Sequence, residues 1–476
     1  MLIKSIKINN YRAFSSEFIV ENVNIPDNEN EGSGLTVFVG ENGCGKTTIL
    51  DAISLPLLTY KADSFSLDDL NDLSKDSLIE LFAENEFTVV SSMPRGSFQA
   101  IGFLFKAHFR SRNARTYLSS TIVSDQKFIK ADNVSLDENH PDLRLNVNNP
   151  FRGKRFDENE ILYLDKNRTF QTRSGTYNTT KFDRIMEDLD YQYIKNEKNV
   201  KNISEIIKSK ITKQSENKFL NEAIEKFEEI SQINLSLNIL DNWKPFHNAF
   251  FAEQKDNCFQ INLNKFGSGY EMIFTLIYSF YLSSQSNKQL LILIDEPELH
   301  LHPSLEEKFV EFLLEISKES QIILTSHSPL FIKQLMRNSF VSVLMLQKTE
   351  QNPELVSIHE KALPYLSANE VNYLAFNFSS IEYHNELYGN LQEKTEKFSE
   401  REIEQFLNDV QGISKNKRWQ REKNGIQVGS EYDVTLQTFI RNIIHHPENK
   451  SMQSEKFSHD ELKQSIETMR KIILSL

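Results

Sequence analysis

Cysteine, long apolar runs and excess positive charge are all scarce in this sequence. Its two cysteines, Cys44 and Cys258, are too few for a disulfide framework, which favours a reducing compartment over secretion. No run approaches the ~18 apolar residues of a membrane span, and the first ten residues, MLIKSIKINN, lack the apolar segment of a secretion signal. We therefore expect a cytoplasmic protein without a membrane span.

The net charge of −13 excludes a protein that is coated in nucleic acid by general attraction, although local basic patches remain compatible with it. The composition is otherwise that of a globular protein. Hydrophobic residues make up 39% of the 476 residues, which is enough for a substantial core. The length indicates about two or three domains.

A glycine-rich loop, residues 40–47, lies between a predicted strand at 35–39 and a predicted helix at 48–58. Its glycines let backbone N–H groups and the helix N-terminus point at phosphate oxygens, while the lysine adds a cation and the threonine a hydroxyl for Mg²⁺. A simple glycine-rich turn would not require Lys-Thr after its last glycine. The pattern predicts that ATP and Mg²⁺ bind here, and the candidate residues are Gly40, Asn42, Gly43, Cys44, Gly45, Lys46, Thr47 and Thr48.

Two adjacent carboxylates end the apolar run LLILI at residues 290–294. A continuous apolar run is typical of a strand that is buried on both faces. At the end of such a strand, facing the phosphate loop, Asp295 suits a Mg²⁺ ligand and Glu296 suits a base that orients or deprotonates the attacking water. Paired acids on a surface loop are the alternative, and the apolar residues before them argue against it.

A histidine follows the next predicted strand, Gln321–Thr325, which comes after an amphipathic helix predicted over Pro303–Ile316. This alternation of strand and helix predicts an α/β fold with a parallel sheet and sites at the carboxyl ends of its strands. At the carboxyl end of its strand, His327 can reach a γ-phosphate or the attacking water, which makes it a catalytic candidate beside Lys46 and Glu296. An isolated histidine at a strand end would more often be structural.

These motifs together resemble the ABC-type ATPase heads of the family that contains chromosome-maintenance, recombination-repair (RecF-like) and overcoming-lysogenization-defect ATPases. The resemblance covers residues 1–60 and about 240–348. It implies a two-lobed head that hydrolyses ATP and a composite site that a second head completes, so the first expected partner is another copy of the chain. It further implies that Arg12 approaches the nucleotide, that Ser268 and Gly269 act on the partner's nucleotide, and that residues 299–303 form a dimer contact.

Four regions are expected from changes of pattern along the chain. They are the N-lobe of the head with the phosphate loop (1–60), an insertion (61–240), the C-lobe of the head (241–348) and a C-terminal helical region (349–476). The insertion begins with β-like runs at 87–92 and 98–109. It continues with a helical pattern over 182–233, where no proline interrupts the helices.

Two C-terminal segments, at residues 372–387 and 435–449, resemble the C-terminal regions of antiphage-defence ATPases that are encoded beside an HNH nuclease. These are the PtuA family of Septu systems and its retron-associated relatives. The resemblance implies an ATPase that binds and regulates an HNH nuclease. In that case the nucleotide state would shift the C-terminal region through the helix that follows His327.

Other functions compete with this one. Arg441 and His446 fit the R-N-x-x-x-H pattern of HEPN ribonucleases, although arginine and histidine at this spacing also occur on ordinary helices. The ATPase motifs alone also suit a DNA-repair head of the chromosome-maintenance or RecF type. A Toprim nuclease is disfavoured, because residues 349–476 contain no D-x-D pair for a metal.

Nucleic acid is a further candidate partner. Residues 415–423 place five cations around Trp419, a combination that suits a nucleic-acid backbone and base stacking. The simpler interpretation of this segment is a solvated helix face. Residues 152–155 form a second, weaker basic cluster.

Overall fold

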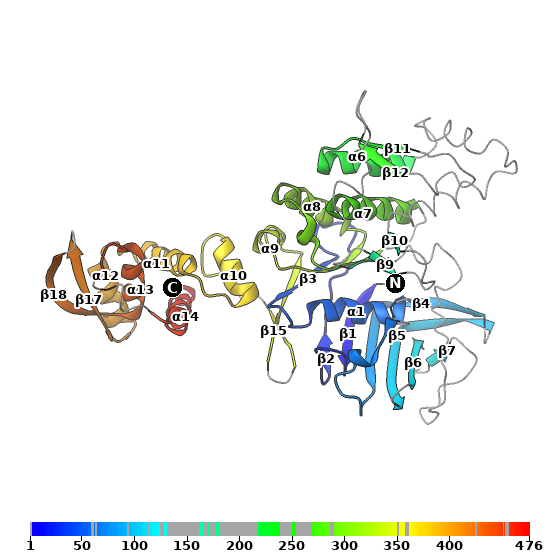
Figure 1. Ribbon diagram of the computed structural model, residues 1–476, viewed down its shortest axis with the longest axis horizontal. Coiled ribbons are helices and arrows are strands. Elements are labelled where there is room, and N and C mark those ends of the chain that lie inside the picture. The colour runs from blue at the N-terminus through cyan, green and yellow to red at the C-terminus, as the bar shows by residue number, and fades with distance from the viewer. Residues whose placement is uncertain are drawn as a thin grey trace. The chain divides into compact units, whose positions relative to one another are not determined.

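A computed structural model divides the chain into two compact units, Met1–Val356 and Ser357–Leu476 (Figure 1). The described residues are 2–58, 61, 64–92, 95–111, 114–123, 128–130, 161–165, 169–171, 178–180, 218–238, 250–253, 268–285, 290–349, 352–357, 361–423, 426–450, 452 and 457–476. The division lies close to the boundary predicted at residue 349. The finer division of the head at residues 60 and 240 stays a prediction.

A six-stranded sheet forms the centre of the first unit, in the order β16-β15-β3-β14-β13-β8. From β15 to β8 all neighbouring strands run parallel, as the sequence predicts. The strands are β3 (Leu35–Gly40), β8 (Ile161–Leu164), β13 (Leu291–Ile294), β14 (Gln321–Thr325), β15 (Ser342–Gln347) and β16 (Glu354–Ser357). Because β3, β13 and β14 are neighbours, the three segments that follow them meet at one edge of the sheet.

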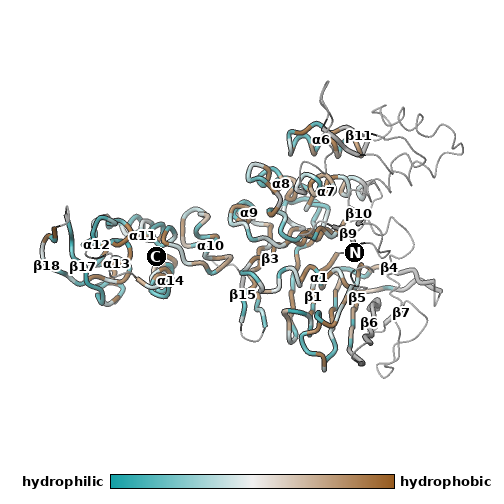
Figure 2. Tube along the Cα trace, viewed as in Figure 1, coloured by the Kyte–Doolittle hydropathy of each residue, from teal (hydrophilic) through white to brown (hydrophobic). Residues whose placement is uncertain are grey.

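The helices alternate with these strands and make the fold a mixed α/β one. They are α1 (Lys46–Leu57), α7 (Ser268–Gln285), α8 (Pro303–Ile316) and α9 (Pro329–Leu335). The predicted bounds of α8 are confirmed. Its buried residues Leu305, Phe309, Leu313 and Ile316 recur with the helical period, and Figure 2 shows hydrophobic and hydrophilic segments alternating along it.

A second, antiparallel sheet belongs to the same unit, in the order β2-β1-β4-β5-β6-β7. Its strands are β1 (Ile3–Asn9), β2 (Phe18–Val20), β4 (Ser77–Ser92), β5 (Arg95–Ser111), β6 (Ala114–Val123) and β7 (Phe128–Lys130). The β-like runs predicted at 87–92 and 98–109 therefore lie in β4 and β5. Since β4 pairs with β1, strand pairing joins the start of the predicted insertion to the first strand of the head.

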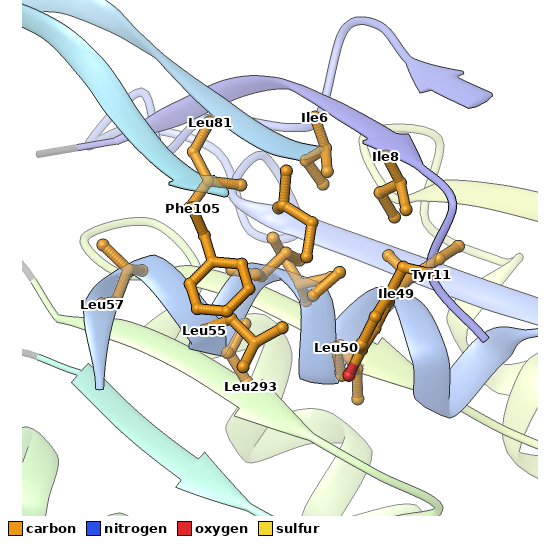
Figure 3. Packing of buried hydrophobic residues seen from close by; sticks show 14 of the residues in the cluster. Ile6, Ile8, Tyr11, Ile49, Leu50, Leu55, Leu57, Leu81, Phe105 and Leu293 are labelled. Carbon is orange, nitrogen blue, oxygen red and sulfur yellow. The ribbon is translucent and has the colours of Figure 1, made fainter. Parts of the chain in front are cut away.

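Helix α1 packs between the two sheets (Figure 3). Ile49 and Leu55 of the helix are buried in one cluster with Ile6 of β1, Phe105 of β5 and Leu293 of β13. Fully burying such a side chain contributes ~1.5–3 kcal/mol. This packing fixes the helix that begins at the end of the phosphate loop.

The remaining elements of the first unit are short or only partly described. They are η1 (Leu67–Asp69), β9 (Thr169–Gln171), β10 (Asn178–Thr180), α6 (Lys218–Ser231), β11 (Leu235–Asn238), β12 (Phe250–Glu253) and η4 (Pro297–His300). Of the helical pattern predicted over 182–233, α6 is confirmed, and residues 182–217 lie outside the described residues. No helix in the described part of the chain is both long and apolar enough to cross a membrane.

The second unit contains five helices, a π-helical turn and one hairpin among its described residues. They are α10 (Ala368–Phe376), α11 (Ile381–Thr395), α12 (Glu400–Gln405), η5 (Phe406–Val410), β17 (Lys417–Lys423), β18 (Ile426–Val434), α13 (Leu436–His445) and α14 (His459–Ser475). Helices predominate among the described residues of 349–476, as predicted, but β16 and the hairpin are strands that the prediction missed. The interpretation of 415–423 as a helix face is wrong, because Arg418 and Arg421 are exposed while Trp419 between them is buried and packs against Phe439.

Candidate ATP site

The phosphate loop connects the end of β3 to the start of α1. Gly40 ends the strand with φ 141°, and a Cβ there would lie 2.3 Å from the carbonyl oxygen of Leu346 in β15. Gly45 caps α1 with φ 95°, and a Cβ there would approach the Phe14 ring at 3.0 Å. Both positions favour glycine for reasons of backbone conformation and space. The loop therefore has the shape that exposes backbone N–H groups at a helix N-terminus.

The Lys46 ammonium is folded over this loop. Its Nζ donates to the carbonyl oxygens of Gly40 and Glu41, at 2.8 Å each, and lies 3.8 Å from Cys44 Sγ. Burial lowers the pKa of Lys46 and raises the pKa of the Cys44 thiol. Since the Cys44 side chain is fully buried, this residue can serve a nucleotide only through its backbone. Lys46 is placed to bind an anion inside the loop.

Thr47 and Asp295 meet as the magnesium prediction requires. The Thr47 hydroxyl donates to both carboxylate oxygens of Asp295, at 3.1 Å each, and the Thr325 hydroxyl donates to Oδ1 at 2.6 Å. Burial, with Glu296 nearby, raises the pKa of Asp295, while the two hydroxyls lower it. A hydroxyl and a buried carboxylate are hard oxygen ligands, so this donor set fits Mg²⁺.

Glu296 and His327 lie against each other at the ends of neighbouring strands. His327 Nε2 is 3.2 Å from Glu296 Oε1. The backbone of Glu296 adopts a left-handed conformation, φ 46°, and its N–H donates to the Thr325 hydroxyl at 3.0 Å. Such a conformation is costly for a non-glycine residue and tends to occur at functional sites. The structure thus brings the predicted base and the predicted histidine together.

Sequence reasoning missed two residues of this site, Thr325 and Glu298. Thr325 links Asp295 to the backbone of Glu296 through one hydroxyl. Glu298, in η4, accepts hydrogen bonds from the loop that contains His327. The sequence pattern identifies Thr325 only as the last residue of a predicted strand and assigns no role to Glu298. A polar residue that ends a buried strand was the available signal for Thr325.

Arg12 has two carboxylate partners within the chain. Its Nη1 lies 2.5 Å from Asp51 Oδ2 and its Nε lies 2.7 Å from Asp69 Oδ1. Asp51, on α1, also accepts from Lys61 at 2.7 Å and from the Tyr163 hydroxyl at 2.8 Å. Burial alone would raise the pKa of Asp51, but these donors and cations lower it. Arg12 is thereby tied to the helix that carries the phosphate loop.

The residues expected to act on the nucleotide of a second head, Ser268 and Gly269, lie at the start of α7. Helix α7 begins at Ser268, and Gly269 in its first turn is buried, whereas residues 266 and 267 lie outside the described residues. The predicted dimer loop begins in η4, where Leu299 is exposed.

The comparisons with known proteins support an ATPase. Residues 1–332 match the family model described as the AAA ATPase domain. The chain belongs to this ATPase family. Sequence relatives include the endonuclease GajA of Bacillus cereus, 22% identical over 76% of this chain and 63% of the relative. They also include the OLD nuclease of Thermus scotoductus, 22% identical over 75% of this chain and 64% of the relative. The chain thus spans less than two thirds of either relative.

Solved structures similar to this ATPase include heads of SMC proteins. An SMC head bound to the C-terminal winged-helix domain of ScpA matches with a TM-score of 0.44 and 13% identity, covering 75% of this chain and 97% of that one. The SMC head domain of Thermotoga maritima matches with a TM-score of 0.38 and 12% identity, covering 76% of this chain and 100% of that one.

Of the ribonuclease candidates in this ATPase, Arg441 lies in the middle of α13 and His446 directly after that helix. The Arg441 guanidinium donates to the Asn442 side chain at 2.9 Å and stands 5.9 Å from the Tyr388 ring. His446 follows the helix, and its Nδ1 lies 3.1 Å from Glu448 Oε1. Both side chains therefore have local partners of the kind expected on an ordinary helix.

The basic cluster at the hairpin faces glutamates. These ion pairs are Lys415–Glu404 (3.9 Å), Lys417–Glu461 (2.5 Å), Arg418–Glu431 (3.9 Å) and Arg421–Glu400 (3.5 Å). Such pairing offsets the positive potential that a phosphate backbone would need. The other predicted basic cluster, residues 152–155, lies outside the described residues.

Proposed function

We propose that this ATPase is the ATP-hydrolysing subunit of a cytoplasmic antiphage-defence complex, in which nucleotide-dependent pairing of two heads regulates a partner nuclease of the HNH type. This function follows the resemblance of the C-terminal segments to the PtuA family. The structural observation that carries it is the concentration of exposed apolar side chains on the C-terminal unit.

Nine of the fourteen large hydrophobic side chains that are exposed among the described residues belong to this smaller unit. They are Tyr365, Phe378, Ile381, Phe398, Val410, Ile426, Val428, Leu474 and Leu476. Tyr365, Phe378 and Phe398 among them are aromatic, and exposed aromatic side chains are enriched at protein interfaces, which favours a protein-binding role for this unit. Two sequence relatives are named as nucleases, which supports a link between this ATPase and nuclease activity.

In the proposed reaction, Lys46 and the N–H groups at the start of α1 hold the phosphates of ATP. Thr47 and Asp295 would hold Mg²⁺, which when bound neutralises charge on the β- and γ-phosphates. Glu296 takes a proton from the attacking water, and His327 contacts both Glu296 and the γ-phosphate. The 3.2 Å contact between these two side chains supports their acting together.

Pairing of two heads would complete the site. Gly269 lies in the first turn of α7, where helix N–H groups can bind the γ-phosphate of ATP held by a second head. Leu299, which is 55% exposed, would be covered by the second head. Ser268 and Arg12 are the remaining contacts that we assign to the nucleotide.

Binding of the chain to a purified HNH nuclease tests the proposal, with isothermal titration calorimetry as the readout. Phe398→Ser, which removes a side chain that is 71% exposed, is expected to weaken binding by about tenfold or more if it lies at the interface centre. Tyr365→Ser tests a second part of the unit. Leu73→Ser, which removes a 50% exposed side chain from the first unit, is the matched control and should leave binding unchanged.

Absence of binding by the wild-type chain would overturn the proposal. RNA cleavage by the chain alone, abolished by His446→Ala, would replace it with the self-contained ribonuclease.

A further inference from the structure

Glu298 connects the end of the acidic strand to the loop that carries His327. Its Oε1 atom accepts three hydrogen bonds, from the Ser326 hydroxyl at 3.0 Å, from the backbone N–H of His327, and from the backbone N–H of Ser328 at 3.1 Å. All three donors are consecutive residues of one short loop after β14. A single carboxylate oxygen therefore holds the backbone of that loop at two neighbouring peptide groups.

Hydrogen bonds to an ionised acceptor are shorter and stronger than those between neutral groups. Burial raises the pKa of Glu298, and the hydrogen bonds from His327, Ser326 and Ser328 oppose that rise. The same loop continues into α9, because Ser328 caps that helix by accepting from the Phe331 N–H at 3.2 Å. The Glu298 carboxylate thus fixes the point at which β14 turns into α9.

This anchoring determines where the His327 ring can lie. The backbone N–H of His327 is held by Glu298, while the ring Nε2 lies 3.2 Å from Glu296 Oε1. Glu296 and Glu298 are separated only by Pro297, so the two carboxylates hold the two ends of one histidine from one turn of chain. Loss of the backbone anchor would free the loop and let the ring move away from Glu296.

We infer that Glu298 is a positioning residue for ATP hydrolysis, which fixes the loop Ser326 to Ser328 so that the His327 ring stays against Glu296. The inference rests on the proposed role of His327. It assigns Glu298 no contact with ATP. Its effect on turnover must therefore pass through the histidine.

A double-mutant cycle on ATP turnover tests this dependence. Glu298→Ala is expected to lower kcat about tenfold with a change in KM of less than about threefold, because the nucleotide contacts of the phosphate loop remain. In the His327→Ala background the same substitution should lower kcat by less than about twofold, since residues that act as a unit are not additive. Glu298→Gln keeps a carbonyl acceptor and should recover most of the activity.

Gln321→Met is the matched control. Gln321 is buried at the other end of β14 and also makes three hydrogen bonds, to the N–H of Ile3 and to the carbonyl oxygens of Ile3 and Asn24. Loss of these hydrogen bonds should lower the melting temperature. Any decrease in kcat that Gln321→Met causes should be independent of His327, so the two factors should multiply in the double variant with His327→Ala.

The inference would be overturned if the double variant lost kcat by the product of the two single-variant factors. An unchanged kcat in Glu298→Ala would also overturn it. A normal kcat in His327→Ala with a low kcat in Glu298→Ala would overturn both the role of His327 and the inference. If Glu298→Ala does not fold, Glu298→Asp takes its place in the same cycle, because its shorter side chain moves the acceptor away from the loop.

Discussion

The imidazole Nε2 of His327 lies 3.2 Å from the carboxylate Oε1 of Glu296, although the two residues follow different strands. Parallel pairing of β13 and β14 produces this contact, because the carboxyl ends of paired strands lie at the same edge of the sheet. A base beside a histidine at that edge is suited to act on a water molecule at the γ-phosphate. The predictions below follow from this geometry.

Glu296→Gln should bind ATP with near wild-type affinity and hydrolyse it at least ~10²-fold more slowly, because the amide cannot accept the proton of the attacking water. Equilibrium binding of a fluorescent ATP analogue and single-turnover hydrolysis measure the two properties separately. Glu315→Gln, on the half-exposed face of α8, is the control. Hydrolysis at the wild-type rate by Glu296→Gln would remove Glu296 as the base.

Thr325→Val should lower kcat by about tenfold, a loss of ~1.4 kcal/mol in transition-state stabilisation. The substitution removes the hydroxyl that donates to Asp295 and accepts from the Glu296 N–H while keeping the shape of the side chain. Thr325→Ser keeps the hydroxyl and should retain most of the rate. Equal rates for the valine and serine variants would show that the hydroxyl has no role.

Asp51→Asn should change how stability depends on pH. The cations and donors around Asp51 hold its pKa below the unfolded value near ~3.9, so the ionised carboxylate stabilises the folded state at neutral pH. That contribution is fully present above the unfolded pKa and is lost as the pH falls through the lower, folded pKa. Chemical denaturation at pH 7 and at about pH 2, which is well below the unfolded pKa, should show a smaller decrease in unfolding free energy for Asp51→Asn than for the wild type. Equal decreases would contradict this role.

ATP and Mg²⁺ should pair the heads of Glu296→Gln, because bound ATP then persists between them. Light scattering should report a mass that doubles on addition of ATP and Mg²⁺, and Leu299→Asp in the same background should prevent doubling while ATP still binds. A charge at this 55% exposed position cannot be buried by a second head without cost. A strict monomer of Glu296→Gln with ATP would contradict head pairing.

The backbone of the site was predictable, and its side-chain contacts were not. Apolar runs and the glycine loop predict β3, β13, β14 and α1, because local pattern determines strands and helices. The three hydrogen bonds that Glu298 accepts and the two that the Thr325 hydroxyl makes arise only when strands distant in sequence become neighbours. The hairpin at β17 was missed for a similar reason, since burial of Trp419 against Phe439 decides the structure of a segment rich in cations.

Titration of ATP against the nuclease activity of the reconstituted complex tests the central claim most directly. A shift from mostly inactive to mostly active requires a difference of roughly 5 kcal/mol between nucleotide states, which in the proposed mechanism the pairing of two heads around ATP would supply. We expect nuclease activity to be low at high ATP and to rise as ATP is depleted, and His327→Ala to weaken this dependence. Nuclease activity that does not change with ATP in the wild-type complex would contradict the account, and activity that rises with ATP would reverse the direction of regulation.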